Sequence, residues 1–196
     1  MGRWEPNARE RLERSALELF LQQGYESTTA AEIAERAGLA KSTFFRHFTD
    51  KREVLFGGQE ALNRLFADAI TGAPGSATPL DAIRAALESA VRIFSPERHV
   101  WVRQRKVVIT GNSDLLEREL LKLASLTAAM ADALRKRGVT DPTASLAAEL
   151  GRLAFHNAYA RWADPANQRD YLEIAHQELD ELRAATAALG QEPPAG

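Results

Sequence analysis

TAAEIAERAGLAKSTFFRHF, residues 29–48, has the pattern of two short helices joined by a tight turn. Thr29 and Glu32 have the spacing of a capping box, in which a hydroxyl and a carboxylate satisfy the free backbone donors at a helix start. Gly38 supplies the turn, and Leu39 returns the chain to the core. The stretch therefore predicts a helix-turn-helix unit.

The second of these two helices has an apolar face and a polar face. Phe44 and Phe48 are four residues apart and form the apolar anchor. The polar positions spread over the remaining surface are Lys41, Ser42, Thr43, Arg46 and His47. A helix with this surface can enter the major groove of DNA. A helix-turn-helix that serves only packing is the alternative, and it is disfavoured because several independent features agree.

Helical periodicity continues on both sides of this unit, and alternating strand patterns are nearly absent. We expect a helix before the unit over residues 9–23 and a long one after it over 51–70, interrupted by Gly57 and Gly58. A Gly-Pro-rich linker follows at residues 72–76. Five more helices are expected at about 80–94, 97–110, 116–137, 142–163 and 172–189. The chain is predicted to be all-α, with nine helices.

Composition excludes several classes of protein. The 196 residues include no cysteine, which rules out disulfide frameworks and thiolate metal sites. No apolar run approaches the roughly 18 residues of a membrane span, and the charged start is unlike a signal peptide, so we expect a cytoplasmic protein without a membrane partner. The net charge of −2 means that a nucleic-acid site must be local.

Several residue pairs and single positions in and around the predicted unit match one known family. They are Gly24-Tyr25, Thr28-Thr29, Ile33-Ala34, Ala37-Gly38, Lys41, Thr43, Phe45, His47-Phe48 and Lys51. With them the chain resembles the tetracycline-repressor (TetR) family over about residues 9–56. The resemblance implies a homodimeric transcriptional regulator, most simply a repressor, that binds a palindromic operator and is released by a small molecule.

The resemblance also implies a division of the chain and roles for single residues. Residues 1–50 would be the DNA-binding domain, 51–71 a connecting helix, 72–190 the ligand-binding and dimerisation domain, and 191–196 a disordered tail. Base or backbone contacts are implied for Lys41 and Thr43, contacts with base edges for Ser42, and phosphate contacts for Thr29, His47 and Lys51. Arg46 lies on the same short helix as His47.

Two positions depart from the family pattern. Phe45 stands where Tyr is usual, so a hydroxyl that would meet a phosphate is missing. Ala40 stands at the expected cap of the recognition helix, where Ser is common, and its lack of a hydroxyl should cost about 1 kcal/mol of local stability.

The last two predicted helices carry a stripe suited to a four-helix dimer seam. Its members are Leu146, Leu150, Leu153, Leu172, Ala175, Leu179, Leu182 and Thr186. The family dimerises through these helices. On the sequence pattern alone, the same stripe could instead be part of the core of a single chain.

Apolar residues between the linker and this stripe could line an effector cavity. They are Phe94, Trp101, Ile109, Met130, Phe155, Tyr159 and Trp162. Arg105 lies in the basic stretch 98–106 and could receive an anionic ligand end. The chain from 107 to 162 resembles mycofactocin-type regulators, which implies a long-chain acyl-CoA effector. The alternatives are that the aromatics are ordinary core and that the cations pair with Glu97 or Glu119.

Signatures of catalysis are missing. The sequence has no phosphate-binding Gly-rich loop, no His-Glu-x-x-His and no Gly-x-Ser-x-Gly. Glu173-x-x-His176 occurs once, whereas di-iron bundles need it twice. We therefore expect no enzyme, metal or cofactor. The competing hypothesis is a helical-bundle enzyme or carrier of a lipophilic cofactor, and salt-dependent operator binding separates the two. Gly57 and Gly58 could form a hinge or could allow close helix packing.

Overall fold

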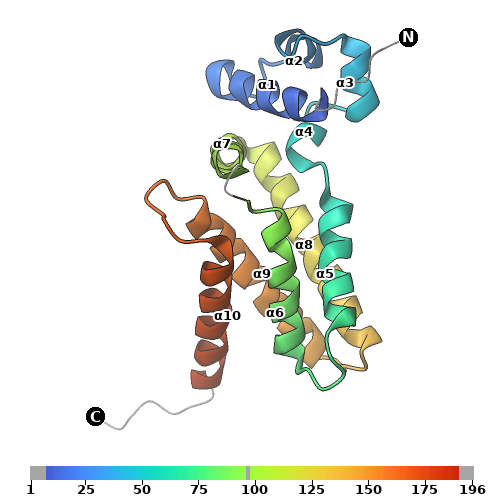
Figure 1. Cartoon of the computed structure of the whole chain (residues 1–196), viewed down its shortest axis with the longest axis vertical. Helices are drawn as coiled ribbons and strands as arrows, with labels where there is room; N and C mark the ends of the chain where they lie inside the picture. The colour runs from blue at the N-terminus through green and yellow to red at the C-terminus, as the bar shows by residue number, and fades with distance from the viewer. Residues whose placement is uncertain (1–7, 96–97, 190–196) are drawn as a thin grey trace. The chain divides into compact units, whose positions relative to one another are not determined.

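The computed structural model describes residues 8–95 and 98–189, and within these ranges it contains helices and no strand. The elements are α1 (Ala8–Gln23), α2 (Ala30–Arg36), α3 (Lys41–His47), α4 (Glu53–Phe56), α5 (Gln59–Gly72), α6 (Pro79–Ser89), η1 (Ala90–Arg92), α7 (His99–Thr110), α8 (Ser113–Lys136), α9 (Thr143–Trp162) and α10 (Tyr171–Ala188) (Figure 1). Counting α4 and α5 as one interrupted helix gives the nine α-helices predicted, so the all-α prediction is confirmed. The predicted tail, 191–196, lies outside the described residues.

The predicted connecting helix is broken at its two glycines. Gly58 has a φ of +91°, a left-handed conformation that favours glycine. A Cβ on Gly57 would lie 2.5 Å from Nη2 of Arg9 and 2.9 Å from the carbonyl oxygen of Glu53. Left-handed backbone therefore separates α4 from α5, and close packing against α1 explains the first glycine.

The chain divides into two compact units. The head unit comprises residues 1–59 and 98–120, and the body unit comprises 60–97 and 121–196. The sequence placed the boundary near residue 72 and assigned α7 and all of α8 to the second domain. The difference arises because Val108, Ile109 and Leu115 are buried in the same apolar cluster as α1–α4. The sequence pattern within α7 and α8 does not predict this contact with distant residues.

The core of the head unit follows the predicted helix faces. The α1 residues Leu12, Ala16, Leu19 and Phe20 are buried, as their three- and four-residue spacing predicts. Ile33 of α2 and Phe44 of α3 have no exposed surface. This packing fixes the orientation of α3 within the head unit.

In the body unit α6, α9 and α10 pack against one another (Figure 1). The predicted linker after α5 is tied to the body unit, because the guanidinium of Arg137 donates hydrogen bonds to the carbonyl oxygens of Ile70 (3.1 Å), Ala73 (2.6 Å) and Pro74 (2.7 Å). They add to the backbone hydrogen bonds that the amides of Ala73 and Ala77 donate to the carbonyls of Ile70 and Pro74. None of the described helices is long and apolar enough to cross a membrane.

Candidate nucleic-acid interface

The helix-turn-helix begins with the capping box that the sequence predicts. The Glu32 amide donates to the Thr29 hydroxyl at 3.2 Å, and the Thr29 amide donates to Oε2 of Glu32 at 2.8 Å. The Thr29 hydroxyl proton is also donated to this carboxylate, at 2.8 Å. These bonds lower the pKa of Glu32, the side-chain bond from Thr29 most of all. Thr29 thus fixes the start of α2, and its hydroxyl proton is already engaged.

α3 has one face in the core and one face in solvent. Phe44 on α3 and Phe48 just after it pack together with ring centroids 5.5 Å apart. The exposed side chains of α3 are Lys41, Ser42, Phe45 and Arg46, and Thr43 and His47 are half-buried. The helix therefore presents two cations, a hydroxyl and one aromatic ring together.

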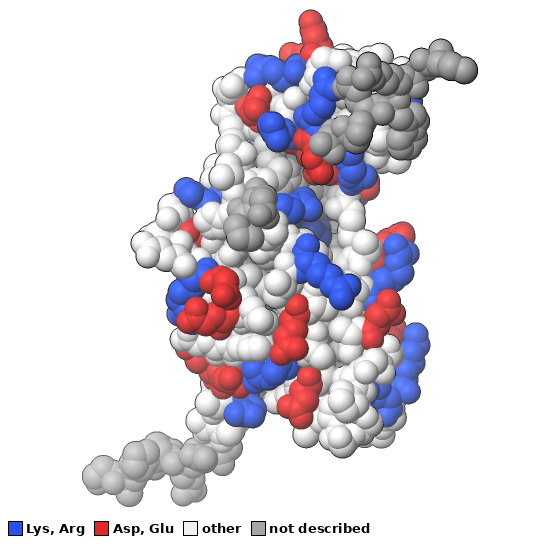
Figure 2. Space-filling model, viewed as in Figure 1, with Lys and Arg blue, Asp and Glu red and all other residues white. Residues whose placement is uncertain are grey.

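Charge on the face drawn in Figure 2 is mixed. Figure 2 shows Lys and Arg side chains interspersed with Asp and Glu across the visible face. Within the described ranges, Arg46 has no ion-pair partner, whereas Arg36 pairs with Glu18 and Arg52 with Asp50. The free cations of α3 therefore matter more to an anionic partner than the net charge of the chain.

Phe45 is the exposed aromatic side chain of α3, with 50% of its surface accessible. Its ring meets the Phe44 ring edge-on, with centroids 5.3 Å apart and planes at 79°. The Lys41 ammonium lies 5.9 Å from the Phe45 ring centroid. The missing hydroxyl that the sequence pointed out leaves a purely apolar group on this surface.

Lys51, for which the family resemblance implies a phosphate contact, makes hydrogen bonds within the head unit. Its ammonium donates hydrogen bonds to the carbonyl oxygens of Tyr25 (2.8 Å), Glu26 (3.2 Å) and Thr28 (3.1 Å). It also lies 4.2 Å from the centroid of the Tyr25 ring, and burial raises the pKa of that phenol to about 12. The three donors of Lys51 hold the turn between α1 and α2.

His47 and Ala40 mark the two ends of α3. Nε2 of His47 is buried and has no hydrogen-bond partner among the described residues. Ala40 occupies the N-cap and provides no side-chain hydrogen bond, as its apolar side chain predicts. α3 therefore begins without a side-chain cap.

The predicted dimer stripe divides into buried and exposed parts. Ala175 and Leu179 of α10 are 0% and 2% exposed in this single chain, so they belong to its own core. The stripe members with accessible surface are Leu146, Leu150, Leu153, Leu172, Leu182 and Thr186. Leu146, with 57% exposed, is the most open of the stripe on α9.

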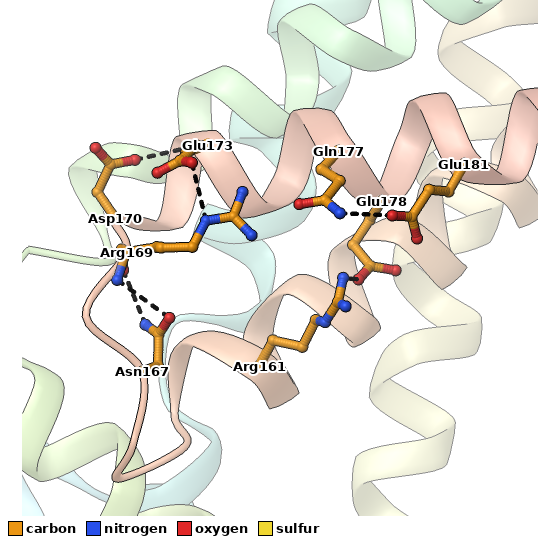
Figure 3. Close-up of polar contacts among 8 residues, drawn as sticks. All are labelled: Arg161, Asn167, Arg169, Asp170, Glu173, Gln177, Glu178 and Glu181. Atoms are coloured by element: carbon orange, nitrogen blue, oxygen red, sulfur yellow. Dashed lines mark hydrogen bonds and ion pairs between the residues drawn. The ribbon is translucent and has the colours of Figure 1, made fainter.

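A buried carboxylate joins α9 to α10. Glu178 is 5% exposed, accepts a hydrogen bond from Nδ2 of Asn157 at 2.9 Å and pairs with Arg161 (Figure 3). At the start of α10 the Asp170 side chain caps the Glu173 amide at 2.9 Å (Figure 3). These contacts fix the register of the two helices that carry the stripe.

The residues proposed from sequence for an effector cavity are divided between the two units. Phe94, Phe155, Tyr159 and Trp162 lie in the body unit, where Phe94 contacts each of the other three rings at centroid distances of 5.4 to 6.0 Å. Met130 is also in the body unit, where its Sδ would lie 3.2 Å from a Cβ on Gly151.

Trp101, Arg105 and Ile109 belong to the head unit instead. The Arg105 guanidinium is buried, donates to the carbonyl oxygen of Leu55 at 2.7 Å and binds the Glu119 carboxylate, with the shorter bond 2.6 Å long. The pairing with Glu119 is the alternative that the sequence left open. Ile109 is core and Trp101 packs on that core.

Tyr171 is a member of the aromatic cluster that sequence reasoning missed. It is 2% exposed, and its ring stacks on Phe94 with centroids 4.3 Å apart and planes at 23°. Burial raises the pKa of its phenol. Tyr171 is the first residue of α10, directly after the Asp170 cap. Helical periodicity could not predict its burial, because no residue of the same helix precedes it.

Comparison with known proteins matches the head unit to regulators. A family model described as bacterial regulatory proteins, tetR family, covers residues 14–57. The HTH-type transcriptional regulator TcmR of Streptomyces glaucescens is 42% identical over 83 residues, which are 42% of this chain and 37% of that protein. YerO of Bacillus subtilis, an uncharacterised HTH-type transcriptional regulator, is 35% identical over 52 residues, 26% of this chain and 18% of that protein. The matched part spans less than two-fifths of either relative.

Solved structures match over nearly the whole chain. FadR of Thermus thermophilus, described as a TetR-family transcriptional repressor in complex with lauroyl-CoA, has a TM-score of 0.53 and 26% identity, covering 96% of this chain and 98% of that one. SmeT, the repressor of the Stenotrophomonas maltophilia multidrug efflux pump SmeDEF, shares the fold, with a TM-score of 0.56, 20% identity and coverage of 91% and 89%. The family model and the curated relatives show that residues 14–57 match the tetR family of bacterial regulatory proteins, and the helical layout of the chain is similar to that of a TetR-family repressor.

Proposed function

We propose that this chain is a TetR-family regulator that acts as a homodimer, binds a palindromic operator through α3 and represses transcription until a lipophilic effector releases it. The observation that carries the DNA-binding step is the exposed face of α3. Its cations and hydroxyl lie together on a short helix whose other face Phe44 anchors in the core. Such a helix can place donors against base edges and phosphates.

The test of DNA binding starts with selection of duplexes from a random pool by the full-length protein. Titrations of a selected duplex over a series of salt concentrations then compare wild type with Arg46→Ala. We expect the variant to bind at least tenfold more weakly, because a free cation on the recognition surface is lost.

Arg64→Ala is the matched control. Arg64 lies on α5 in the body unit, and its side chain is 70% exposed. The Arg64→Ala variant should bind the duplex as tightly as wild type does. Failure to enrich any duplex, or equal binding by Arg46→Ala, would contradict the proposal, and the first result would favour the helical-bundle carrier instead.

The accessible stripe on α9 and α10 supports the homodimer. Two recognition helices held about 34 Å apart are needed to contact successive major grooves of a palindrome. Leu146, Leu150 and Leu153 lie at three- and four-residue spacing on one side of α9 and keep accessible surface, so a second copy can cover them.

Introducing negative charge into this apolar surface tests the dimer. We expect Leu150→Glu combined with Leu153→Glu to shift the protein from dimer to monomer in size-exclusion chromatography with light scattering. Leu121→Glu on α8 is the control, because Leu121 is 65% exposed and outside the stripe. If the double variant stays dimeric and its two copies associate as tightly as in wild type, the dimer interface lies elsewhere.

The effector proposal rests on the body unit and on one relative. The aromatic rings around Phe94 form a largely buried apolar cluster within one unit, and the Thermus thermophilus FadR structure contains lauroyl-CoA. We therefore propose a lipophilic ligand, with an acyl-CoA as the first candidate. Arg105 is not included in this site, because its guanidinium is held by Glu119 and Leu55.

Native mass spectrometry tests the effector directly. The protein is mixed in parallel with lauroyl-CoA, with free laurate and with CoA alone, each with and without a selected duplex. Lauroyl-CoA should add its mass to the dimer and release the DNA, whereas CoA alone should do neither. If no acyl-CoA shifts the mass or releases DNA, this effector class is wrong.

A further inference from the structure

Phe45 is an apolar side chain in the middle of an otherwise polar surface. Helical spacing places Ser42 three residues before it and Lys41 four residues before it, with Arg46 next to it. All four side chains are exposed, and half of the Phe45 surface is accessible. Single exposed apolar residues are common on protein surfaces. This one differs because its neighbours are the groups proposed to bind DNA.

The position of the ring is set by its own helix. The buried Phe44 ring meets it edge-on at 5.3 Å between centroids, and the Lys41 ammonium lies 5.9 Å from its centroid. The ring therefore has a supported side and an open side. A phenyl ring carries no hydrogen-bond donor or acceptor, so it cannot replace the water around a phosphate or a polar base edge.

The major groove offers a phenyl ring one apolar partner. Among the base edges exposed there, only thymine carries a methyl group, on C5, and Phe is one of the side chains that contacts it. We propose that Phe45 is a specificity-determining residue that recognises thymine in each half-site by packing its ring against that methyl group. This inference rests on the proposed DNA binding. It assigns to Phe45 a base contact in place of the phosphate contact that its missing hydroxyl removes.

Replacing thymine by uracil tests the contact without touching the protein. Deoxyuridine pairs as thymidine does and lacks only the methyl group. In a duplex selected by the full-length wild-type protein, each thymidine is replaced in turn, symmetrically in both half-sites. At one position, replacing thymidine by deoxyuridine should weaken wild-type binding about threefold to tenfold. The salt dependence of binding should stay the same, because no phosphate contact changes.

Variants of the protein complete the cycle. Phe45→Ala should bind the thymine duplex more weakly and should no longer distinguish thymine from uracil at that position. Arg46→Ala is the matched control, which should bind both duplexes more weakly and keep the thymine preference. Circular dichroism of each variant confirms that the head unit is folded.

Three outcomes would overturn the inference. Wild-type binding could be insensitive to uracil at every position, or Phe45→Ala could retain the thymine preference. Tighter binding by Phe45→Tyr to both duplexes, with no uracil effect, would place the ring against the backbone. Each of these results leaves the proposed function standing. Failure to select any duplex removes both the function and the inference, so the two failures are distinguishable.

Discussion

At the scale of one residue, Lys51 makes a set of contacts within the head unit that the sequence did not predict. Its ammonium is surrounded by three carbonyl oxygens from residues 25, 26 and 28. A charged donor bonded in this way contributes to stability because one ammonium joins three carbonyls of the turn, of which that of Tyr25 also accepts a hydrogen bond from the Thr28 amide. Lys51 is therefore a structural residue of the turn after α1.

Lys51→Ala should destabilise the protein by about 2 kcal/mol, measured by urea unfolding. Lys41→Ala is the paired variant, because Lys41 is exposed on α3 and makes only the distant contact with the Phe45 ring. It should leave unfolding unchanged and weaken operator binding. Equal stability of Lys51→Ala and wild type would show that the three hydrogen bonds contribute nothing.

Ala40 allows a stabilising substitution. It is exposed at the N-cap of α3, with φ −71° and ψ 148°, the extended conformation that capping residues adopt. Ala40→Ser should add the missing cap and raise the free energy of unfolding by about 1 kcal/mol. Ala31→Ser, at an exposed position inside α2, supplies no cap and should not stabilise. A cooperative urea transition for each variant provides the comparison.

At the scale of the element, short helices depend on their caps. α2 has seven residues, too few for stability by intrinsic propensity. The Thr29–Glu32 box defines its start, and Thr78 with Asp81 does the same for α6. Hydrogen bonds from the threonine side chains lower the pKa of both acids. The carboxylate forms are thus the ones that the fold favours.

Acid should weaken these caps in a defined direction. Because the folded pKa of Glu32 lies below its ordinary value of 4.5, its stabilisation is present above that value and lost as the pH falls through the folded pKa. We expect Glu32→Gln to lower the melting temperature at pH 7 and to match wild type at acid pH well below 4.5. Glu35→Gln, at an exposed position on the same helix, is the control, and its melting temperature should equal that of wild type at both pH values. A wild-type advantage that persists in acid would contradict this cause.

At the scale of the whole molecule, the head unit is not a continuous stretch of sequence. Residues 98–120 complete it, with Val108, Ile109 and Leu115 in its core and Arg105 bonded to Leu55. Each buried aliphatic side chain contributes about 2 kcal/mol. Together they account for a large part of the stability of a small domain.

A fragment of residues 1–59 should therefore show no cooperative thermal transition by circular dichroism. In the full chain, Leu115→Ala should cost about 3 kcal/mol. Leu116→Ala is the neighbouring control, because Leu116 is 43% exposed, and it should cost less than about 0.5 kcal/mol. A fragment that melts cooperatively at the wild-type temperature would show that α1–α4 are sufficient.

The features that sequence predicted correctly are local. The capping box, the stripe of α1, the Phe44–Phe48 anchor and the uncapped start of α3 depend on residues within a few positions of each other. Helical spacing and capping chemistry act over this range, so one chain read alone reveals them. The polar face of α3 was predicted for the same reason.

The features that required the tertiary structure join distant segments. Lys51 binds Tyr25 across 26 positions, Arg105 binds Leu55 across 50, and Arg137 binds Ile70 across 67. A long cation can reach many carbonyls and carboxylates, and only the packing of helices decides which one it meets. For the same reason the sequence by itself determined the helices and the polar face of α3, while the fold decided that α7 belongs to the head unit and that Ala175 and Leu179 are core.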